Sequence, residues 1–440
     1  MLMSSENQYD AVIIGAGVIG SAVAYELAQR GWKTCNIDKL PAAGYGSTSN
    51  SCAIVRFSYS TYQGVAMSYE GMHYWTDWEN YLGGSEIDES GLIEFRQTGT
   101  ALIKAPDGHH QKVTPLLEEL NIPHEHWDLN RLSERLPILD HGVLGPPSRP
   151  EDESFWADPT DDIEGALFTP ESGYVSDPQL SSHNLQRAAE ACGAEFRFGQ
   201  TVVAINSEDN RTTGVRLEDG TEIQSPVVVN VAGPHSYLIN DLAGLTGTMN
   251  ITTKALRHEV HHVPSPEGFD FEADGLHISD GDAAVYFRPA VGNNILIGSE
   301  DPECDVKEWV DPDDFDQEIR DDQWEAQVLR CARRVEGLGL PHEKKGVVDL
   351  YDVSDDWIPI YDRTDLDGFY VAIGTSGNQY KNAGVAGHCM AELITAVEAG
   401  HDHDSDPIKV NGRYTGLEMD LGFYSRNREI NPNSSFSVNG

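Results

Sequence analysis

Short, wholly apolar runs that lead into glycine-rich turns are the most regular pattern of this chain. The first run, Ala11–Ile14, has no polar alternation, as expected of a parallel strand buried on both faces. It leads into Gly15-Ala-Gly-Val-Ile-Gly20, after which residues 19–30 predict a helix. Residues 33–37 predict a second strand, and Asp38 follows it. This order of strand, glycine turn, helix, strand and acid predicts a Rossmann-like βαβ unit.

Two later segments, residues 193–236 and residues 368–399, are expected to return to the same domain. Residues 201–205 predict a strand, with a hairpin around Asp219-Gly220. Residues 226–231 form an apolar run that ends in Ala232-Gly233. Residues 368–373 form another, followed by Gly374-Thr-Ser-Gly377 and an apolar helix to about residue 399. Glycines at the carboxyl ends of these strands would let the backbone approach a ligand closely.

The segments between these returns predict a second domain built on an antiparallel sheet. Residues 252–263 and 283–298 have the pattern of its strands, residues 92–105 alternate like a strand, and residues 113–120 predict a short helix. We therefore expect an α/β fold with antiparallel β structure and two discontinuous domains. The expected boundaries are 8–91, 171–240 and 346–399 for the Rossmann-like domain, 92–170 and 241–345 for the second domain, and 400–440 for a polar tail on the surface.

The glycines and the acid of the first unit have the spacing of a dinucleotide site. Gly15 would permit the tight turn, Gly17 would let the backbone approach a pyrophosphate, and Gly20 would let the helix pack on the strand. The positive end of the helix would then face the phosphates. Asp38 stands where a carboxylate can accept a hydrogen bond from a ribose hydroxyl. The sequence therefore predicts a bound dinucleotide.

Net charge limits the partners. The 440 residues carry 72 acidic and 30 basic side chains, for a formal charge of −42. Nucleic acid and anionic membrane surfaces are disfavoured, because both require a basic surface. We expect a strongly hydrated surface suited to high salt, where repulsion is screened. A specific cationic partner is the alternative.

Cysteine use and hydropathy favour a cytoplasmic protein with no transmembrane segment. The six cysteines show no C-x-x-C pair and are expected to be reduced thiols. Residues 11–28 are apolar, but Glu26 interrupts them and their glycines belong to the motif, so we do not expect a signal or membrane segment.

Four sequence pieces, taken together, are more specific than the first glycine motif: residues 46–59 (GSTSNSCAIVRFSY), 173–178 (GYVSDP), 286–298 (from YFRP to ILIG) and 374–381 (GTSGNQYK). With them the chain resembles the flavin-dependent D-amino-acid oxidase superfamily, in particular its sarcosine oxidase and dimethylglycine dehydrogenase branch, over roughly residues 8–400. The resemblance implies FAD, with its isoalloxazine ring at the domain boundary. The cofactor-binding residues that it implies are Gly15, Gly17, Gly20, Asp38, Lys39, Ser47, Thr48, Val203, Gly233, Gly374, Gly377 and Asn378.

The resemblance also implies a grip for a substrate carboxylate. Arg56 matches the arginine that pairs with the carboxylate in the sarcosine oxidase branch, and Lys381 matches a second carboxylate partner. A planar guanidinium offers two parallel donors that orient a carboxylate. Tyr286 and Tyr351 match tyrosines that line the substrate pocket, where aromatic walls exclude water and favour a neutral amine. The alternatives are surface ion pairs for the two cations and ordinary core packing for the tyrosines.

Departures from the family pattern affect the electron acceptor and the cofactor linkage. Monomeric sarcosine oxidases have a lysine that helps reduced flavin react with oxygen, and the aligned residue here is Leu296. A dehydrogenase that passes electrons to a carrier protein or quinone is therefore favoured over an oxidase that uses oxygen. The cysteine that other members link to flavin is absent from residues 348–351, and Asn50 or a neighbour replaces the linking histidine. We expect non-covalent FAD. Cys52 is the one thiol that the sequence places where a covalent link to flavin could form.

No metal site is expected. Residues 258–262 match H-E-x-x-H, but zinc binding by this motif requires a helix. The flanking pattern alternates and prolines follow at 264 and 266, which favours a strand. Residues 401–404 (HDHD) are expected to be solvated, and residues 311–322 lack the glycine of an EF-hand loop.

We thus expect an FAD-dependent oxidoreductase that acts on the C–N bond of a small N-methylated or secondary amino acid, such as sarcosine or dimethylglycine. A D-amino-acid or 2-hydroxy-acid dehydrogenase remains open, because each would recognise a carboxylate in the same way. A flavin-containing assembly subunit without turnover is the alternative of another class.

Overall fold

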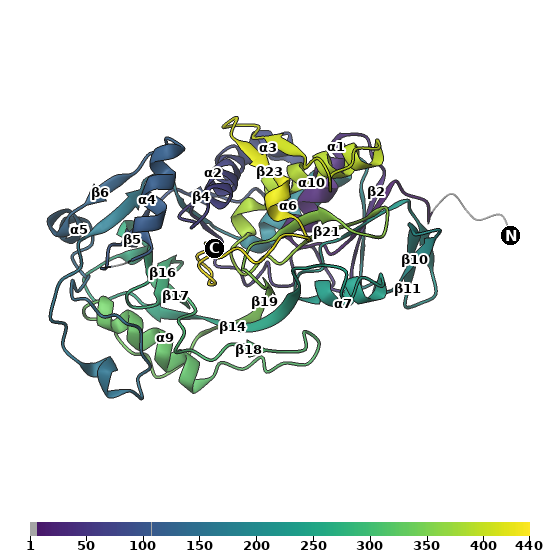
Figure 1. The fold of residues 1–440 in the computed structure, drawn as a ribbon. Helices are drawn as coiled ribbons and strands as arrows, with labels where there is room; N and C mark the ends of the chain where they lie inside the picture. Colours follow the sequence, from purple (N-terminus) through teal and green to yellow (C-terminus); the bar gives the residue numbers. More distant parts are fainter. Residues whose placement is uncertain (1–6, 107) are drawn as a thin grey trace.

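Two lobes lie side by side in the computed structural model, which describes residues 7–106 and 108–440 (Figure 1). The first lobe contains a sheet that is parallel except at one edge. Its strands, in spatial order, are β20 (Ile360–Arg363), β21 (Phe369–Ile373), β13 (Val227–Asn230), β1 (Ala11–Ile14), β2 (Thr34–Asp38) and β9 (Glu195–Phe198). Only β20, which pairs with β21, is antiparallel to its neighbour in this sheet. This confirms the Rossmann-like fold.

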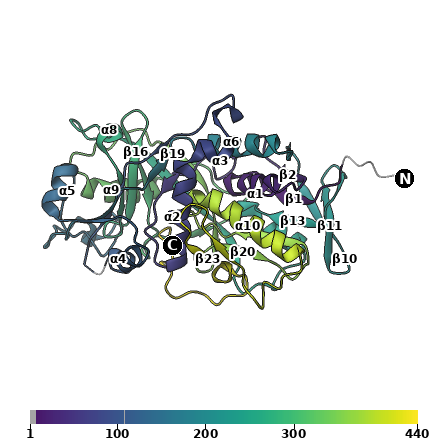
Figure 2. The same ribbon diagram turned by 90° about the horizontal axis from the view of Figure 1, so that it is seen from above.

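Both faces of this sheet are covered, which explains the apolar run at its centre. Ala11 and Ile13 pack with helices on one face, whereas Val12 and Ile14 belong to a separate core on the other face. Figure 2 shows the helices of the first face alongside one another. They are α1 (Val18–Gln29), α6 (Pro178–Ala191) and α10 (Ala383–Glu398). The opposite face is covered by α7 (Ser236–Leu242) and by a small sheet of β10 (Val202–Glu208), β11 (Arg211–Leu217) and β12 (Glu222–Gln224).

The second lobe is built on a larger sheet that is mostly antiparallel. In spatial order its strands are β18 (Glu308–Trp309), β14 (Thr253–Pro264), β17 (Asn294–Ser299), β16 (Val285–Ala290), β15 (His277–Asp280), β5 (Thr100–Ile103), β7 (Ala166–Thr169) and β6 (Glu125–Trp127), with β19 (Gly346–Ser354) paired to β14. The helices of this lobe are α4 (His110–Glu119), α5 (Leu129–Arg135), α8 (Phe271–Asp274) and α9 (Asp321–Arg334).

The remaining elements join the lobes or extend the first one. A small sheet of β3 (Ile54–Val55), β8 (Gly173–Val175) and β4 (Phe95–Arg96) links segments far apart in sequence. Helices α2 (Tyr62–Thr76) and α3 (Trp78–Leu82) follow β3, and β22 (Lys409–Asn411) and β23 (Glu418–Asp420) form a hairpin near the C-terminus. Short 3₁₀ turns cover Ser85–Ile87, Glu153–Trp156, Gly233–His235, Tyr380–Asn382 and Leu421–Tyr424.

Two sequence predictions require correction in the second lobe. The boundary at residue 346 is wrong, because β19 pairs with β14 from Thr253 opposite Ser354 to His261 opposite Gly346. Residues 346–354 therefore lie in the sheet of the second lobe. Residues 92–105 do not form one strand either, since β4 and β5 belong to different sheets. Gly99, with a φ of +83°, lies between them and breaks the extended backbone.

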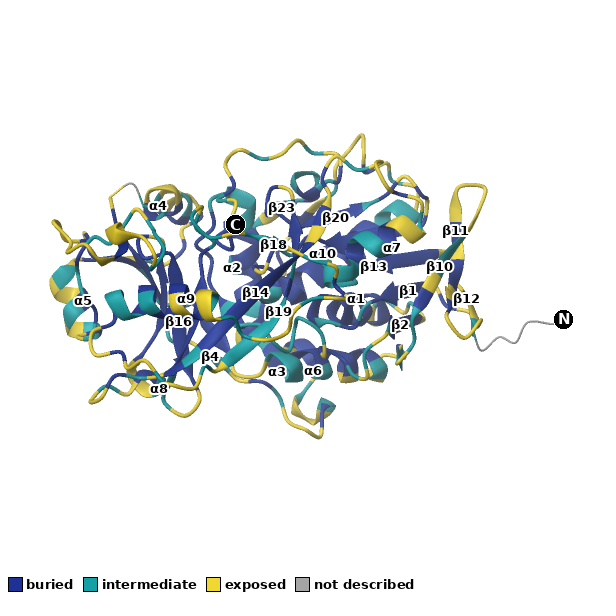
Figure 3. Cartoon of the chain, turned by 90° about the horizontal axis from the view of Figure 1, so that it is seen from below, coloured by how far each residue is buried: buried dark blue, intermediate teal, exposed yellow. Residues whose placement is uncertain are grey.

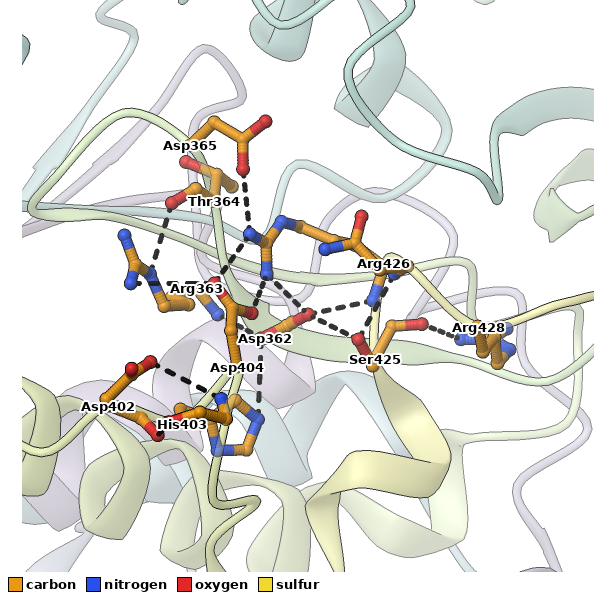
Figure 4. A network of polar contacts seen from close by, with 12 residues as sticks. Asp362, Arg363, Thr364, Asp365, Asp402, His403, Asp404, Ser425, Arg426 and Arg428 are labelled. Atoms are coloured by element: carbon orange, nitrogen blue, oxygen red, sulfur yellow. Dashed lines mark hydrogen bonds and ion pairs between the residues drawn. The ribbon is translucent and has the colours of Figure 1, made fainter.

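The tail beyond residue 400 is not a solvated surface segment, as its polar composition suggested. Met419 and Leu421 are fully buried, and the Arg426 side chain is inserted among carboxylates (Figure 4). Its guanidinium bonds to Asp362 at 3.1 Å, to Asp404 at 2.7 Å and to Asp365 at 2.7 Å. A buried guanidinium requires such partners, and here the partners lie 22 to 64 positions away. The buried colour of the strands in both lobes and the exposed loops between them are visible in Figure 3.

No helix within residues 7–106 and 108–440 combines the length and the apolar character that crossing a bilayer requires.

Candidate functional site

A cavity of about 980 Å³ runs from the glycine turn of the first lobe to the large sheet of the second. Its walls include the ends of β1, β2 and β13, the loop before β3, and strands β14, β16 and β19. Most of the predicted site residues line it: Gly15, Gly17, Gly20, Asp38, Lys39, Ser47, Thr48, Arg56, Gly233, Tyr286, Tyr351, Gly377, Asn378 and Lys381. The structure thus brings together residues from segments that are separated by more than 300 positions.

Two predicted residues do not line the cavity. Val203 on β10 is 37% exposed, whereas its neighbour Val202 is buried and forms part of the wall. Successive strand side chains point to opposite faces, so a shift of one residue changes which valine faces a ligand. Gly374 lies behind the wall, where its N–H donates to the Asp352 Oδ2 at 2.6 Å. Its role in the structure is to allow the close approach of Ser354, because a Cβ there would lie 2.9 Å from the Ser354 Cβ.

The glycine turn is shaped by backbone contacts. A Cβ on Gly15 would lie 2.3 Å from the Val231 carbonyl oxygen, and the φ of Gly15 is +112°. A Cβ on Gly20 would lie 2.1 Å from the Gly15 carbonyl oxygen, so this glycine allows α1 to pack on the turn. Gly17 is different, because only the Thr48 Oγ1, at 3.2 Å, would be near its Cβ. The backbone at Gly17 is therefore open toward the cavity.

The first turn of α1 is suited to an anion. Gly17 occupies the N-cap position without a side chain, and the first turn carries no acidic residue. The Val18 N–H donates to the Thr48 Oγ1 at 3.1 Å. Backbone N–H groups and the helix dipole at such a terminus stabilise negative charge.

Asp38 and Lys39 extend the site along the end of β2. The Asp38 carboxylate accepts from the Ala16 N–H at 2.7 Å and from the Leu40 N–H at 2.8 Å, which fixes it beside the glycine turn. Burial raises the pKa of Asp38 above its ordinary value. Lys39 Nζ reaches the Asp313 carboxylate and lies 2.8 Å from the His235 Nε2. His235 and Asp313 also line the cavity, and sequence analysis missed both.

Arg56 is buried at the other end of the cavity. Its Nη1 donates to the Ser58 carbonyl oxygen at 2.9 Å, and its Nη2 donates to the Val438 carbonyl oxygen at 2.6 Å. The guanidinium carbon lies 5.0 Å from the centroid of the Tyr59 ring. No carboxylate pairs with Arg56 in the part of the chain that the structure describes, so the alternative of a surface ion pair does not hold.

Lys381 lies close to Arg56 and is also buried. Its Nζ donates to the Asn378 carbonyl oxygen at 2.6 Å and to the Tyr59 hydroxyl at 3.0 Å. Burial, with a smaller contribution from Arg56, holds the pKa of Lys381 well below its ordinary value. A buried guanidinium and a buried amine thus share one small region, where burial disfavours the charged form of the amine unless an anion binds there.

The two predicted tyrosines form a wall of the same region. The Tyr286 hydroxyl lies 3.2 Å from the Cys52 Sγ, and the Tyr351 ring stacks on His258 with the ring centroids 4.4 Å apart. A Cβ on Gly377 would lie 2.5 Å from the Tyr351 ring, so this glycine provides room for the tyrosine. Burial raises the pKa of both tyrosines well above the ordinary value, which keeps the phenols neutral.

Further cavity residues were not found from the sequence. His277 is buried, bonds Thr100 through its Nδ1 at 3.1 Å, and has a pKa far below the ordinary value because of burial. His258 could have been found within H-E-x-x-H, but the motif was considered only for zinc. Val438 and Asn439 carry no motif, and no pattern in the sequence places them in the cavity.

The residues of the H-E-x-x-H match lie on β14, so the predicted strand is confirmed. Among the described residues, one group has the composition and spacing for a metal ion: Glu118, His124 and His126, none of which lines the cavity. Cys52 is the one cysteine in the cavity wall, and burial raises its pKa. Leu296 is buried in an apolar cluster with Tyr286 and Val438.

The cavity offers what FAD requires of a protein. The anion site at α1 suits a pyrophosphate, and Asp38 lies where a ribose hydroxyl could donate to it. Apolar side chains such as Ile37 and Val202 line the same end and could cover an adenine. The opposite end, near Arg56 and Tyr286, is left for the ring system and a substrate.

Comparison with known proteins gives consistent relationships. The model of the family described as FAD dependent oxidoreductase matches residues 10–393. FAD-dependent oxidoreductase domain-containing protein 1 of Bos taurus is 24% identical over 423 residues, which cover 88% of this chain and 81% of that protein. Monomeric sarcosine oxidase of Bacillus sp. (strain NS-129) is 26% identical over 415 residues, with 90% and 95% covered. The solved structure of L-proline dehydrogenase from P. horikoshii superposes with a TM-score of 0.74 at 19% identity, covering 96% of this chain and 97% of that one.

Proposed function

Because this chain belongs to the FAD dependent oxidoreductase family, we propose that it oxidises the C–N bond of a small N-methylated or secondary amino acid, as in sarcosine or dimethylglycine. The observation that carries the proposal is the position of Arg56 and Lys381. Both are buried basic side chains at the same end of the cavity, and they come from segments 325 positions apart. Such a pair suits a small anion, and an amino-acid carboxylate provides one.

In this proposal the chain's own residues bind and orient the substrate. Arg56 would turn its Nη donors toward the carboxylate, and Lys381 would add a second charge. Tyr286 and Tyr351 would exclude water from the amine and favour its neutral form, whose lone pair assists the loss of hydride from the adjacent carbon. FAD supplies the redox chemistry when bound, by accepting that hydride. Water would then add to the imine and release formaldehyde from an N-methyl group or a keto acid from the α-carbon.

We propose that the FAD is held without a covalent bond and that a carrier protein or quinone is favoured over oxygen as electron acceptor. Two observations support this. Cys52 is the one cavity cysteine, and its thiol is already within 3.2 Å of the Tyr286 hydroxyl. Leu296 aligns with the lysine that helps monomeric sarcosine oxidases use oxygen, and it offers no amine in the apolar cluster that contains Tyr286. Release of flavin by acid precipitation, with colourless protein remaining, is the expected result for the first point.

Anaerobic mixing with sarcosine, dimethylglycine, D-alanine and a 2-hydroxy acid tests the proposed chemistry. Bleaching of the flavin absorbance by a secondary or N-methylated amino acid is expected. Faster bleaching by D-alanine or the hydroxy acid would favour the corresponding dehydrogenase. Those substrates would bind through the same carboxylate contacts, so the rate of flavin reduction is what distinguishes them. Bleaching by none of them would favour the assembly subunit without turnover. Arg56→Ala should slow bleaching at subsaturating substrate, whereas Arg216→Ala, at an exposed position of β11, should not.

A further inference from the structure

The last residues of the chain lie within the candidate substrate region. Residues 434–440 lead to the space between the lobes, where the C-terminal label stands in Figure 1. Val438 is 5% exposed and Asn439 is 8% exposed, and both line the cavity. The preceding residues 431–433 are partly or fully exposed, so burial is concentrated in the final part of the segment.

A peptide carbonyl of this segment uses a donor of Arg56. The Val438 carbonyl oxygen accepts from the Arg56 Nη2 at 2.6 Å, while Nη1 donates to Ser58. Both terminal nitrogens of the guanidinium therefore have protein oxygens as partners. A carboxylate that binds Arg56 through Nη1 and Nη2 therefore competes with the Val438 carbonyl oxygen for the position in front of Nη2.

Side-chain contacts hold the segment in this position. The Asn439 Nδ2 donates to the Glu300 Oε2 at 2.9 Å, and the Glu300 Oε1 accepts from the Ser279 hydroxyl at 2.6 Å. The Val438 side chain packs in the apolar cluster that contains Tyr286 and Leu296. Outside the cavity, the Lys307 Nζ donates to the Phe436 carbonyl oxygen at 3.3 Å.

Besides the bonds of Val438 to Arg56 and of Gly440 to Ser60, the chain is attached to the first lobe by ion pairs upstream of residue 434. Arg426 is held by Asp362, Asp365 and Asp404 (Figure 4). Arg428 bonds the Asp356 carboxylate at 2.7 Å. Movement of residues 434–440 would therefore leave the packing of residues 400–428 in place.

We propose that residues 434–440 are an intramolecular competitor for the carboxylate site, displaced from Arg56 when an anionic substrate binds. This inference rests on the proposed function, because it takes Arg56 as the carboxylate partner. A neutral carbonyl accepts a weaker hydrogen bond from a guanidinium than a carboxylate does, so a carboxylate can win the exchange. The need to displace the segment lowers the apparent affinity for the substrate in proportion to the fraction of molecules in which Arg56 is free. Because only an anion competes well with the carbonyl, the segment also selects anions over uncharged amines.

Binding of acetate, which has no C–N bond to oxidise, tests the competitor without turnover. The holoenzyme is titrated with acetate and followed by the flavin spectrum and by calorimetry. A chain that ends at Asn433 should bind acetate about tenfold more tightly than the full chain, because no segment has to be displaced. Asn439→Leu, which removes only the bond to Glu300, should give a smaller change in the same direction. Ile430→Ala, at a residue that is 54% exposed and lies before the segment, is the matched control and should leave the affinity unchanged.

Hydrogen exchange gives a second test. If residues 434–440 were only a static wall of the pocket, acetate would not speed the exchange of their amides. Amides of residues 434–440 should exchange faster when acetate saturates the full chain, while those of residues 418–428 should not. Equal acetate affinity in the full chain, the chain that ends at Asn433 and Asn439→Leu would overturn the proposed competitor and leave carboxylate recognition intact. Slower hydrogen exchange of residues 434–440 with acetate would do the same. Failure of all forms to bind acetate would instead remove the carboxylate site of the proposed function, and the competitor with it.

Discussion

Arg56 and Lys381 share one aromatic neighbour, although 325 positions separate them in the chain. The Arg56 Cζ lies 5.0 Å and the Lys381 Nζ 5.2 Å from the centroid of the Tyr59 ring. The Tyr59 hydroxyl also donates to the Asn378 carbonyl oxygen, which accepts from Lys381 as well. Tyr59 thus contacts both basic side chains, and its hydroxyl joins them to the glycine loop before α10.

Lys381 should take up a proton when a carboxylate binds. Burial and Arg56 hold the pKa of Lys381 well below its ordinary value, and an anion beside it would favour the charged amine and raise that pKa. The affinity for acetate should therefore fall as pH rises. Calorimetry in two buffers of different ionisation enthalpy measures the uptake directly. Lys381→Met should remove it, and an undiminished uptake in that variant would assign the proton to another group.

Gly15→Ala should prevent FAD binding and destabilise the fold. The new Cβ would lie 2.3 Å from the Val231 carbonyl oxygen, at a φ of +112° that disfavours a side chain. We expect a loss of bound flavin and of about 2 kcal/mol or more in the free energy of unfolding. Gly31→Ala is the control, since Gly31 also has a positive φ, of +84°, but nothing lies within 4 Å of its Cβ. Retention of flavin by Gly15→Ala, measured by absorbance, would contradict this account of the turn.

Glu300 should make stability depend on pH. Burial raises its pKa from 4.5 to about 7, so the folded chain retains a proton that the unfolded chain releases between these values. Stability of the native chain relative to Glu300→Gln should therefore fall as pH rises through this window, by about 3 kcal/mol at most. Denaturant unfolding at several pH values measures the difference. Glu303→Gln changes an exposed glutamate nearby and should show no such trend.

Salt should stabilise this protein. A formal charge of −42 produces repulsion within the folded chain, and salt screens it. The melting temperature should rise by several degrees between about 0.1 M and about 2 M KCl, because the Debye length shortens over that range. Sucrose of equal osmolality is the control for general solvent exclusion. A melting temperature independent of KCl would instead favour a specific cationic partner as the reason for the charge.

The parts of the fold predicted well are those determined by contacts close in sequence. The expected helix at 19–30 is α1 (Val18–Gln29), and the expected strand at 33–37 is β2 (Thr34–Asp38). Here the glycine turn fixes how the first strand leads into α1, and each neighbouring apolar run has the pattern of a single helix or strand. Most of the candidate site residues also reach the cavity, because the quoted pieces are short and lie at strand ends. Their roles in binding and catalysis remain predictions.

The failures come from long-range pairing. The polar segment around Arg426 predicts an exposed side chain. Its burial is explained by ion pairs with Asp362, Asp365 and Asp404, which lie 22 to 64 positions earlier. The contact between Arg56 and Val438 spans 382 positions, and no sequence pattern marks Val438 as its partner. The error at Val203 is of another kind, because the strand was correct and the face was reversed by one residue.

The cavity wall includes both Ile14 and Asn439, so one compartment joins segments that lie 425 positions apart in the chain. A nascent chain on the ribosome can form the first βαβ unit early, but it cannot complete the compartment until residues 438 and 439 have emerged. Flavin uptake during synthesis should consequently follow the emergence of these residues, and the appearance of yellow colour would report that both lobes have folded around the cavity.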